Sequence, residues 1–307
     1  MALKLFDFTT GVSFRNYITK QNKNRIKKMY RDLSKDLAKE ANLLKGRTNV
    51  SSVLRTGQIA GLQHMIVDSI SNIDTNLENL IRTGMTKVSF GVVKDATTLL
   101  KEAGLNIKAA YQNVPQDVVA RITTGTVYEQ GWSLSKRIWQ DGRDISKEVN
   151  TIVAKGVAGN KTAYEIAKEL EKYVNPNAAK PWDWGKVYPG CRKVIDYNAQ
   201  RLSRTMVQHA YQQSLITTCK GNPYIKGIMW IADGGERTCE ICADRDGQIY
   251  PVDDVPIDHP NGLCTQEAVL VDDVDAVSDA LVDDALDELD SDDYRAWKEY
   301  VGDFDWE

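Results

Sequence analysis

The chain of 307 residues is 42% hydrophobic and 27% charged with a net charge of −4, a balance typical of a soluble globular protein. No stretch approaches the roughly 18 consecutive apolar residues of a membrane span, and the N-terminus lacks the apolar run of a signal peptide, so we expect a protein that remains in cytosol-like surroundings. The five cysteines are odd in number and four lie between Cys191 and Cys242, which argues against the disulfide framework of a secreted protein.

The first 125 residues are predicted to form an elongated, basic helical region. Apolar residues recur at helical spacing over 20–45, and Gly46 is expected to end this helix. A second apolar stripe runs from Leu62 to Leu80. Gly84 interrupts the pattern, so we expect a separate third helix between Met85 and Gly104.

The segment 20–55 is strongly basic. It contains eleven Lys and Arg residues against only Asp32, Asp36 and Glu40. Such a segment can contact DNA phosphates without reading the base sequence, or it can bind an acidic partner. It can equally be a solvated helix face, and the sequence leaves the three interpretations open.

Residues 126–222 are predicted to form a helical core. The expected helices lie between Trp132 and Trp139, over 144–155, over Lys161–Tyr173 and over Val194–Lys220. Ser133 or Ser135 is expected to cap the first helix and Asn160 the third, because Ser and Asn side chains accept bonds from helix N-terminal amides.

Residues 223–271 are predicted to form a small α+β module. A strand is expected from Ile225 to Ala232, and Asp246-Gly247 is a tight-turn signal before a second short strand. We therefore expect a small hairpin that presents Cys239 and Cys242 from one side. The run from His259 to Gly262 is a further turn, which would present His259 and Cys264 from the other.

These four residues have the spacing of a zinc site. Cys239 and Cys242 form a C-x2-C pair, and His259 and Cys264 form an H-x4-C pair. Two close pairs of thiol and imidazole ligands suit tetrahedral Zn²⁺, and four protein ligands leave no open position for water, so the predicted ion is structural. Two alternatives stay open, namely ordinary buried thiols and a redox dithiol at Cys239 and Cys242.

The alternative functional class is a metal-dependent enzyme that processes nucleic acid. Asp258-His259 followed by Asn261 resembles the start of an HNH nuclease motif. That chemistry needs a further histidine, yet His64 and His209 lie upstream in expected helices and no histidine follows Cys264. We therefore expect no enzymatic activity.

A set of residues in the second half of the chain resembles a known family. They are Arg204-Thr205, Trp230, Asp233, Arg237-Thr238 with Cys239 and Cys242, Asp246-Gly247, and His259-Pro260-Asn261-Gly262 with Cys264. This succession resembles the C-terminal domain of tailed-phage minor head proteins, the Mu protein F-like or phage head morphogenesis family, over residues 126–270.

The resemblance implies a low-copy structural protein of the phage head. It would act at the portal vertex in head assembly, DNA packaging or DNA delivery, with the portal and other head or scaffolding proteins as partners. Members of the family are not established enzymes, so no catalytic residue is implied. Many relatives have Glu after the Arg-Thr pair, where this chain has Met206.

The acidic tail 272–307 lies outside the resemblance. Arg295 and Lys298 are its only basic residues, and valine and leucine recur at helix-like intervals among its aspartates, so we expect a docking helix there. Taken together, the sequence predicts a mainly α protein, α+β overall, with long helices in the N-terminal and middle regions and a small zinc-binding module near the C-terminus. Its expected location is the phage head near the portal, after synthesis in the host cytoplasm.

Overall fold

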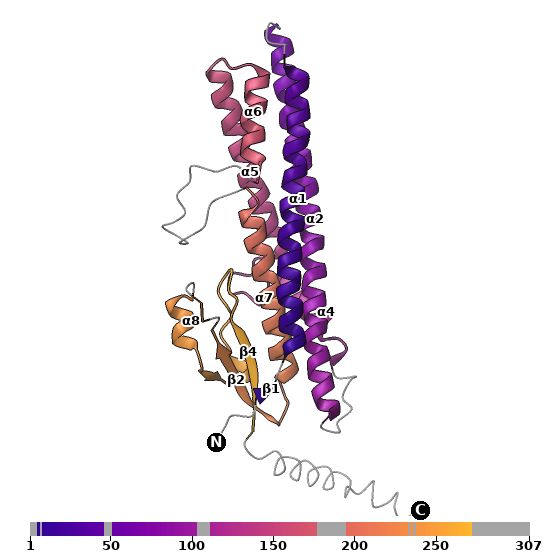
Figure 1. Cartoon of the computed structure of the whole chain (residues 1–307), viewed down its shortest axis with the longest axis vertical. Helices are drawn as coiled ribbons and strands as arrows, with labels where there is room; N and C mark the ends of the chain where they lie inside the picture. The colour runs from indigo at the N-terminus through magenta and orange to yellow at the C-terminus, as the bar shows by residue number, and fades with distance from the viewer. Residues whose placement is uncertain are drawn as a thin grey trace, which may run out of the picture. The chain divides into compact units, whose positions relative to one another are not determined.

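The structure is a computed structural model that describes residues 5–6, 8–45, 51–102, 111–176, 195–232, 234–235 and 238–271 (Figure 1). The chain divides into two compact units. The helical unit comprises Phe8–Thr218 and Pro256–Cys264, and the sheet unit comprises Met1–Asp7, Cys219–Val255 and Thr265–Glu307. The mainly α fold with a small β-sheet near the C-terminus is confirmed. The acidic tail lies outside the described residues.

Two long helices, α1 (Thr9–Leu44) and α2 (Ser52–Glu102), pack side by side in the helical unit (Figure 1). At 1.5 Å per residue they are roughly 54 Å and 77 Å long. Helix α1 begins at Thr9 instead of near residue 20. Its first turns bury Gly11 and Arg15, which contribute nothing to an apolar periodicity, and for this reason the pattern concealed the true start.

Helix α2 is continuous, so the predicted break at Gly84 is wrong. A Cβ atom at Gly84 would lie 2.9 Å from Cγ2 of Ile18 and 3.0 Å from Nδ2 of Asn22. The missing side chain thus lets α1 approach α2 closely at this point. The glycine serves helix packing and does not end the helix.

The described residues of the helical unit form four more helices: α4 (Val114–Thr124), α5 (Leu134–Ala158), α6 (Ala163–Val174) and α7 (Tyr197–Cys219). Ser133 caps α5 as predicted, but α5 runs on through 144–155 as one helix. The predicted cap of α6 is wrong, because Thr162 occupies that position and forms a capping box with Glu165.

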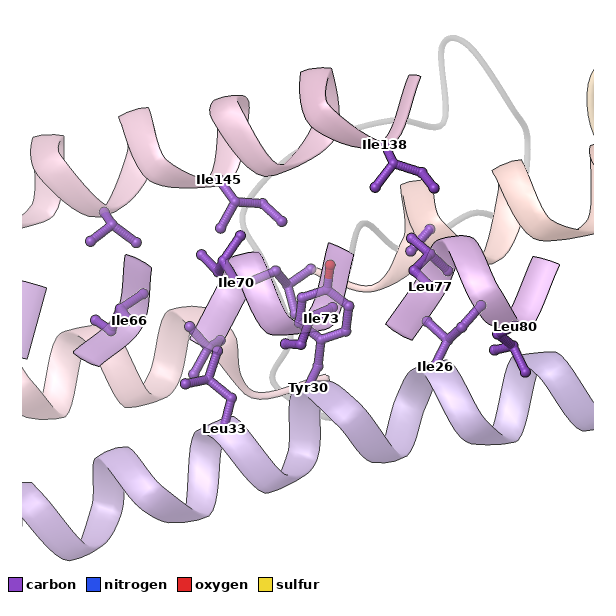
Figure 2. Packing of buried hydrophobic residues seen from close by; sticks show 14 of the residues in the cluster. Ile26, Tyr30, Leu33, Ile66, Ile70, Ile73, Leu77, Leu80, Ile138 and Ile145 are labelled. Carbon is purple, nitrogen blue, oxygen red and sulfur yellow. The ribbon is translucent and has the colours of Figure 1, made fainter. Parts of the chain in front are cut away.

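One hydrophobic core joins these helices. Figure 2 shows Ile26, Tyr30 and Leu33 of α1 facing a row of isoleucines and leucines of α2, with Ile138 and Ile145 of α5 on the other side. The same cluster includes residues of α4, α6 and α7. The boundary between the compact units therefore does not fall between residues 125 and 126. The division into the segments 1–125, 126–222, 223–271 and 272–307 remains a prediction.

The described residues of the sheet unit form four antiparallel strands in the order β1-β4-β2-β3. They are β1 (Leu5–Phe6), β2 (Ile225–Ile231), β3 (Ile249–Tyr250) and β4 (Thr265–Leu270). The short helices α8 (Glu240–Arg245) and η1 (Val252–Asp254) connect the later strands. On β2, Trp230 is fully buried, and the Arg245 guanidinium lies 5.0 Å from its ring centroid.

Among the described residues no helix combines the length and hydropathy needed to cross a bilayer.

Candidate metal centre

The loop 256–264, which contains two of the predicted ligands, is a defined turn in the helical unit. The amide of Gly262 donates to the carbonyl of His259 over 2.9 Å, and Asn261 has a φ of 70°. A Cβ atom at Gly262 would lie 2.2 Å from Oδ2 of Asp258, so no larger residue fits. The predicted turn from His259 to Gly262 is confirmed.

Two glutamines of α7 bind the loop on both sides of Asp258. The Gln212 amide donates from Nε2 to the carbonyl of Pro256 over 2.7 Å, and its Oε1 accepts from the amide of Asp258 over 3.0 Å. One turn earlier, Nε2 of Gln208 donates to Oδ2 of Asp258 over 3.0 Å and to the carbonyl of Cys264 over 2.6 Å. Both glutamines are buried, so these bonds form away from water, where leaving a polar group unsatisfied is most costly.

The Arg204-Thr205 pair binds the tip of the same turn. Nη1 of Arg204 donates to Oδ1 of Asn261 over 2.8 Å, and Oγ1 of Thr205 accepts from the Asn261 amide over 2.8 Å. With Gln208 and Gln212, these residues recur on one face of α7 at helical spacing. The Arg-Thr pair noted in the sequence therefore positions the turn through hydrogen bonds.

Arg15 of α1 completes this network and was missed in the sequence analysis. Its side chain is 4% exposed, and its Nη1 donates to Oε1 of Gln208 and to the carbonyl of Cys264, both over 3.0 Å. Its guanidinium also lies 5.2 Å from the ring centroid of Tyr211. A basic residue at a buried position of the α1 repeat was the available signal, but 249 positions separate Arg15 from Cys264.

His209 is a structural residue of this network. Its Nε2 lies 2.9 Å from the carbonyl oxygen of Asp258, which can only accept, so Nε2 bears the proton. Its Nδ1 then accepts from the hydroxyl of Tyr128 over 2.9 Å. Burial lowers the pKa of His209 to about 4, so the ring is neutral. Both ring nitrogens are engaged, and neither is available to bind a metal or activate water.

The ring of His259 has the opposite tautomer. Its Nδ1 lies 3.1 Å from the carbonyl oxygen of Pro260, so Nδ1 donates and the lone pair lies on Nε2. Metal-binding histidines commonly donate from one ring nitrogen to a carbonyl or carboxylate in this way. The turn thus orients His259 in a form that suits a metal ligand.

The C-x2-C pair lies between β2 and β3, which pair antiparallel as the predicted hairpin requires, but the connection contains a helical turn. Cys239 is the N-cap of α8, and its carbonyl accepts from the amide of Ala243 over 2.9 Å. Cys242 lies within α8 and is buried. The Asp246-Gly247 turn does exist, with a φ of 73° at Gly247, but it follows α8 and leads into β3.

Each unit brings two candidate ligands together. In the sheet unit the ligand atoms of Cys239 and Cys242 lie within 4.8 Å of each other, and in the helical unit so do those of Asp258 and Cys264. Asp258 was not predicted as a ligand. Its Oδ2 accepts from Gln208 and its Oδ1 accepts from the amide of His259 over 2.8 Å, which favours a role in orienting the neighbouring ligands.

Comparison with known proteins identifies one family. Residues 147–265 match the family described as phage Mu protein F like protein. The matched segment includes α7 and the loop 256–264, and therefore includes the residues whose contacts are described above, except Arg15 and Tyr128. Neither the curated proteins nor the solved structures include a match.

Proposed function

We propose that this chain, whose residues 147–265 match the family described as phage Mu protein F like protein, is a structural minor protein of a tailed-phage head that acts at the portal vertex. The family match is the observation that carries the proposal. Its role there is in head assembly, DNA packaging or DNA delivery. Its partners are the portal and other head or scaffolding proteins.

The polar chemistry of the matched segment supports a structural role. Arg204, Thr205, Gln208 and Gln212 each form at least one hydrogen bond to the loop 256–264. A nuclease of the HNH kind needs a second histidine near the first. Both nitrogens of His209 are engaged with protein groups, which counts against it as that residue.

The head role is tested by locating the protein in particles. Heads purified from the phage that encodes this chain, with and without portal, would be compared by quantitative mass spectrometry. We expect a low copy number in complete heads and loss of the protein from portal-less heads. Equal amounts in both would overturn the portal position, and absence from all heads would overturn the structural role itself.

We propose further that Cys239, Cys242, His259 and Cys264 bind one structural Zn²⁺. Three thiols and an imidazole are the donors of structural zinc sites, and such a closed set leaves no position for a reacting water. The ion would supply cross-linking free energy to a small sheet unit. Zinc-finger peptides gain an apparent ~10–16 kcal/mol from their metal, and a fraction of that suffices to order the loop and α8.

The metal proposal has a direct test. Protein purified without chelator should contain about one zinc per chain by elemental analysis, as expected for a single tetrahedral site. The Cys242→Ser and Cys264→Ser variants should lose the zinc, whereas Cys219→Ser, which changes a buried thiol of α7, should retain it. Zinc-free wild-type protein with a melting temperature indifferent to EDTA would contradict the proposal.

A contact with packaged DNA through the basic segment 20–55 forms part of the proposed function. Phosphate contacts of this kind are independent of base sequence and weaken steeply as salt rises. Duplex binding by the full chain should therefore fall by orders of magnitude between low and moderate salt. Binding that is insensitive to salt would refute this contact.

A further inference from the structure

The outer surface of α1 has a row of cations that lack ion-pair partners among the described residues. This basic face comprises Lys20, Lys23, Lys27, Arg31 and Lys35, which recur at helical spacing over roughly 22 Å. Two neighbouring lysines differ, because Lys28 pairs with Asp32 and Lys39 pairs with Asp36. The basic face is therefore available to a negatively charged partner.

An exposed aromatic patch adjoins the basic face at its N-terminal end. It comprises Phe14 and Tyr17 of α1, which are 42% and 59% exposed, and Phe90 of α2, which is 49% exposed. Phe14 packs against α2 at Gly91, the residue after Phe90, because a Cβ atom at Gly91 would lie 2.5 Å from Cδ2 of Phe14. Tyr17 lies one turn before Lys20 on the outer side of α1. Apolar and basic surfaces thus follow one another along a single helix.

The tail 272–307 has the complementary composition. It contains fifteen Asp and Glu residues against two basic ones, a net charge of −13, so with −4 for the whole chain the preceding residues carry +9. Between 272 and 293 there are eleven acidic residues and no basic one. Five aromatic residues follow between Tyr294 and Trp306. An acidic stretch followed by an aromatic one matches, in the antiparallel direction, the basic face of α1 and the aromatic patch that precedes it.

From this complementarity we propose that the tail 272–307 docks on α1 of its own chain, with its acidic part on the basic face and its aromatic part on the patch formed by Phe14, Tyr17 and Phe90. The tail is long enough to do so. Thirty-six extended residues span roughly 120 Å, which exceeds the roughly 77 Å of α2, the longest helix described. Covalent attachment also raises the effective concentration of the tail to the millimolar range.

The cations of α5 are a poorer receiving surface. Lys136 lies over the ring of Trp132 at 4.6 Å and Arg143 over that of Trp139 at 4.7 Å, so both are already engaged with aromatic faces. Lys147 lies 3.8 Å from Asp144. Since α1 has both unpaired cations and exposed aromatic rings, it is the surface that fits the tail. Docking there would shield the basic face from other polyanions, DNA included, until one displaced the tail.

Carbodiimide cross-linking of the full chain tests this proposal, because the reagent joins lysines only to carboxylates with which they are in contact. In the wild-type protein, Lys23 and Lys27 should cross-link to tail carboxylates, and the yield should fall at about 0.5 M salt, where charges are screened within a few ångströms. The triple variant Lys20→Glu, Arg31→Glu, Lys35→Glu should reduce these cross-links roughly tenfold.

A matched variant controls for net charge. Lys147→Glu, Lys155→Glu and Lys172→Glu change three exposed cations of α5 and α6 by the same total charge, and should leave the tail cross-links unchanged. Unchanged helical circular dichroism would establish that both variants fold. The proposal would be overturned if the tail cross-links were spread evenly over the exposed lysines. It would also be overturned if the yield of tail cross-links were equal in the two variants. Cross-links found only between two chains and lost on dilution would also overturn it, in favour of docking on a second copy.

Discussion

The helical core and the loop 256–264 are stabilised by opposite kinds of interaction. In the core, α1, α2 and α5 meet through aliphatic side chains such as Leu37 and Ile66, whose contacts have no preferred direction. The loop instead depends on Gln208, Gln212 and Arg15, which form directed hydrogen bonds to specific loop atoms. The core therefore supplies stability over a long interface, while the polar network determines one geometry for the candidate metal ligands.

Truncation of the core should have the largest effect. Leu37 and Ile66 are 0% exposed, so Leu37→Ala or Ile66→Ala should each lower the free energy of unfolding by about 2–5 kcal/mol through lost burial and a residual cavity. Denaturant unfolding followed by circular dichroism would measure this. Leu43→Ala, at a position 61% exposed on the same helix, should change stability by less than about 0.5 kcal/mol. Equal effects at Leu37 and Leu43 would argue against the described core.

Removal of one polar group should have a smaller effect that is concentrated in the loop. Gln208→Leu deprives Asp258, Cys264 and Arg15 of a partner inside the helical unit, at a cost of about 1–3 kcal/mol. Hydrogen exchange of residues 256–264 should accelerate more than that of α2. The matched change Gln213→Leu, on the more exposed side of α7, should leave the loop unaffected. A uniform acceleration along the whole chain would contradict a local role.

The Tyr128→Phe variant should lose about 1 kcal/mol, because it removes only the hydroxyl that donates to Nδ1 of His209. The difference in the midpoint of denaturant unfolding measures the effect. Tyr17→Phe, which changes a hydroxyl on an exposed ring, should have no measurable effect. If both variants behaved alike, the hydrogen bond between Tyr128 and His209 would lose its support.

A separate, pH-dependent effect concerns an ionisable group at the edge of the core. Burial, with the nearby charge of Asp141, raises the pKa of Asp74 from 3.8 to about 7. The folded protein therefore binds this proton more tightly than the unfolded chain. The resulting stabilisation is fully present below pH 3.8 and is lost as the pH rises to about 7.

Asp74→Asn should flatten this part of the pH profile of stability, which thermal melts between pH 4 and 7 would record. Asp68→Asn, which removes an exposed carboxyl of the same helix, is the matched control variant. If wild-type stability instead rose between pH 4 and 7, and Asp74→Asn left that profile unchanged, the carboxyl of Asp74 would not be buried as described.

Local patterns were sufficient wherever a residue acts through its neighbours in sequence. The recurrence of Ile66, Ile70 and Ile73 predicted the buried face of α2, because helical periodicity follows from backbone geometry alone. The turn from His259 to Gly262 was likewise predicted from turn-forming residues. Local patterns failed at the cap of α6, where Asn160 and Thr162 are both good candidates and the Glu165 side chain decides in favour of Thr162.

The sequence by itself thus determined the mainly helical class, the family resemblance, and the four candidate ligands Cys239, Cys242, His259 and Cys264. Tertiary structure alone decided that Gly84 admits α1 and leaves α2 unbroken, and that Arg15 reaches the loop 256–264. The physical reason is sequence distance. A motif records residues that act within a few positions of one another, whereas the space beside a glycine and the partner of a buried arginine depend on segments that only folding brings together.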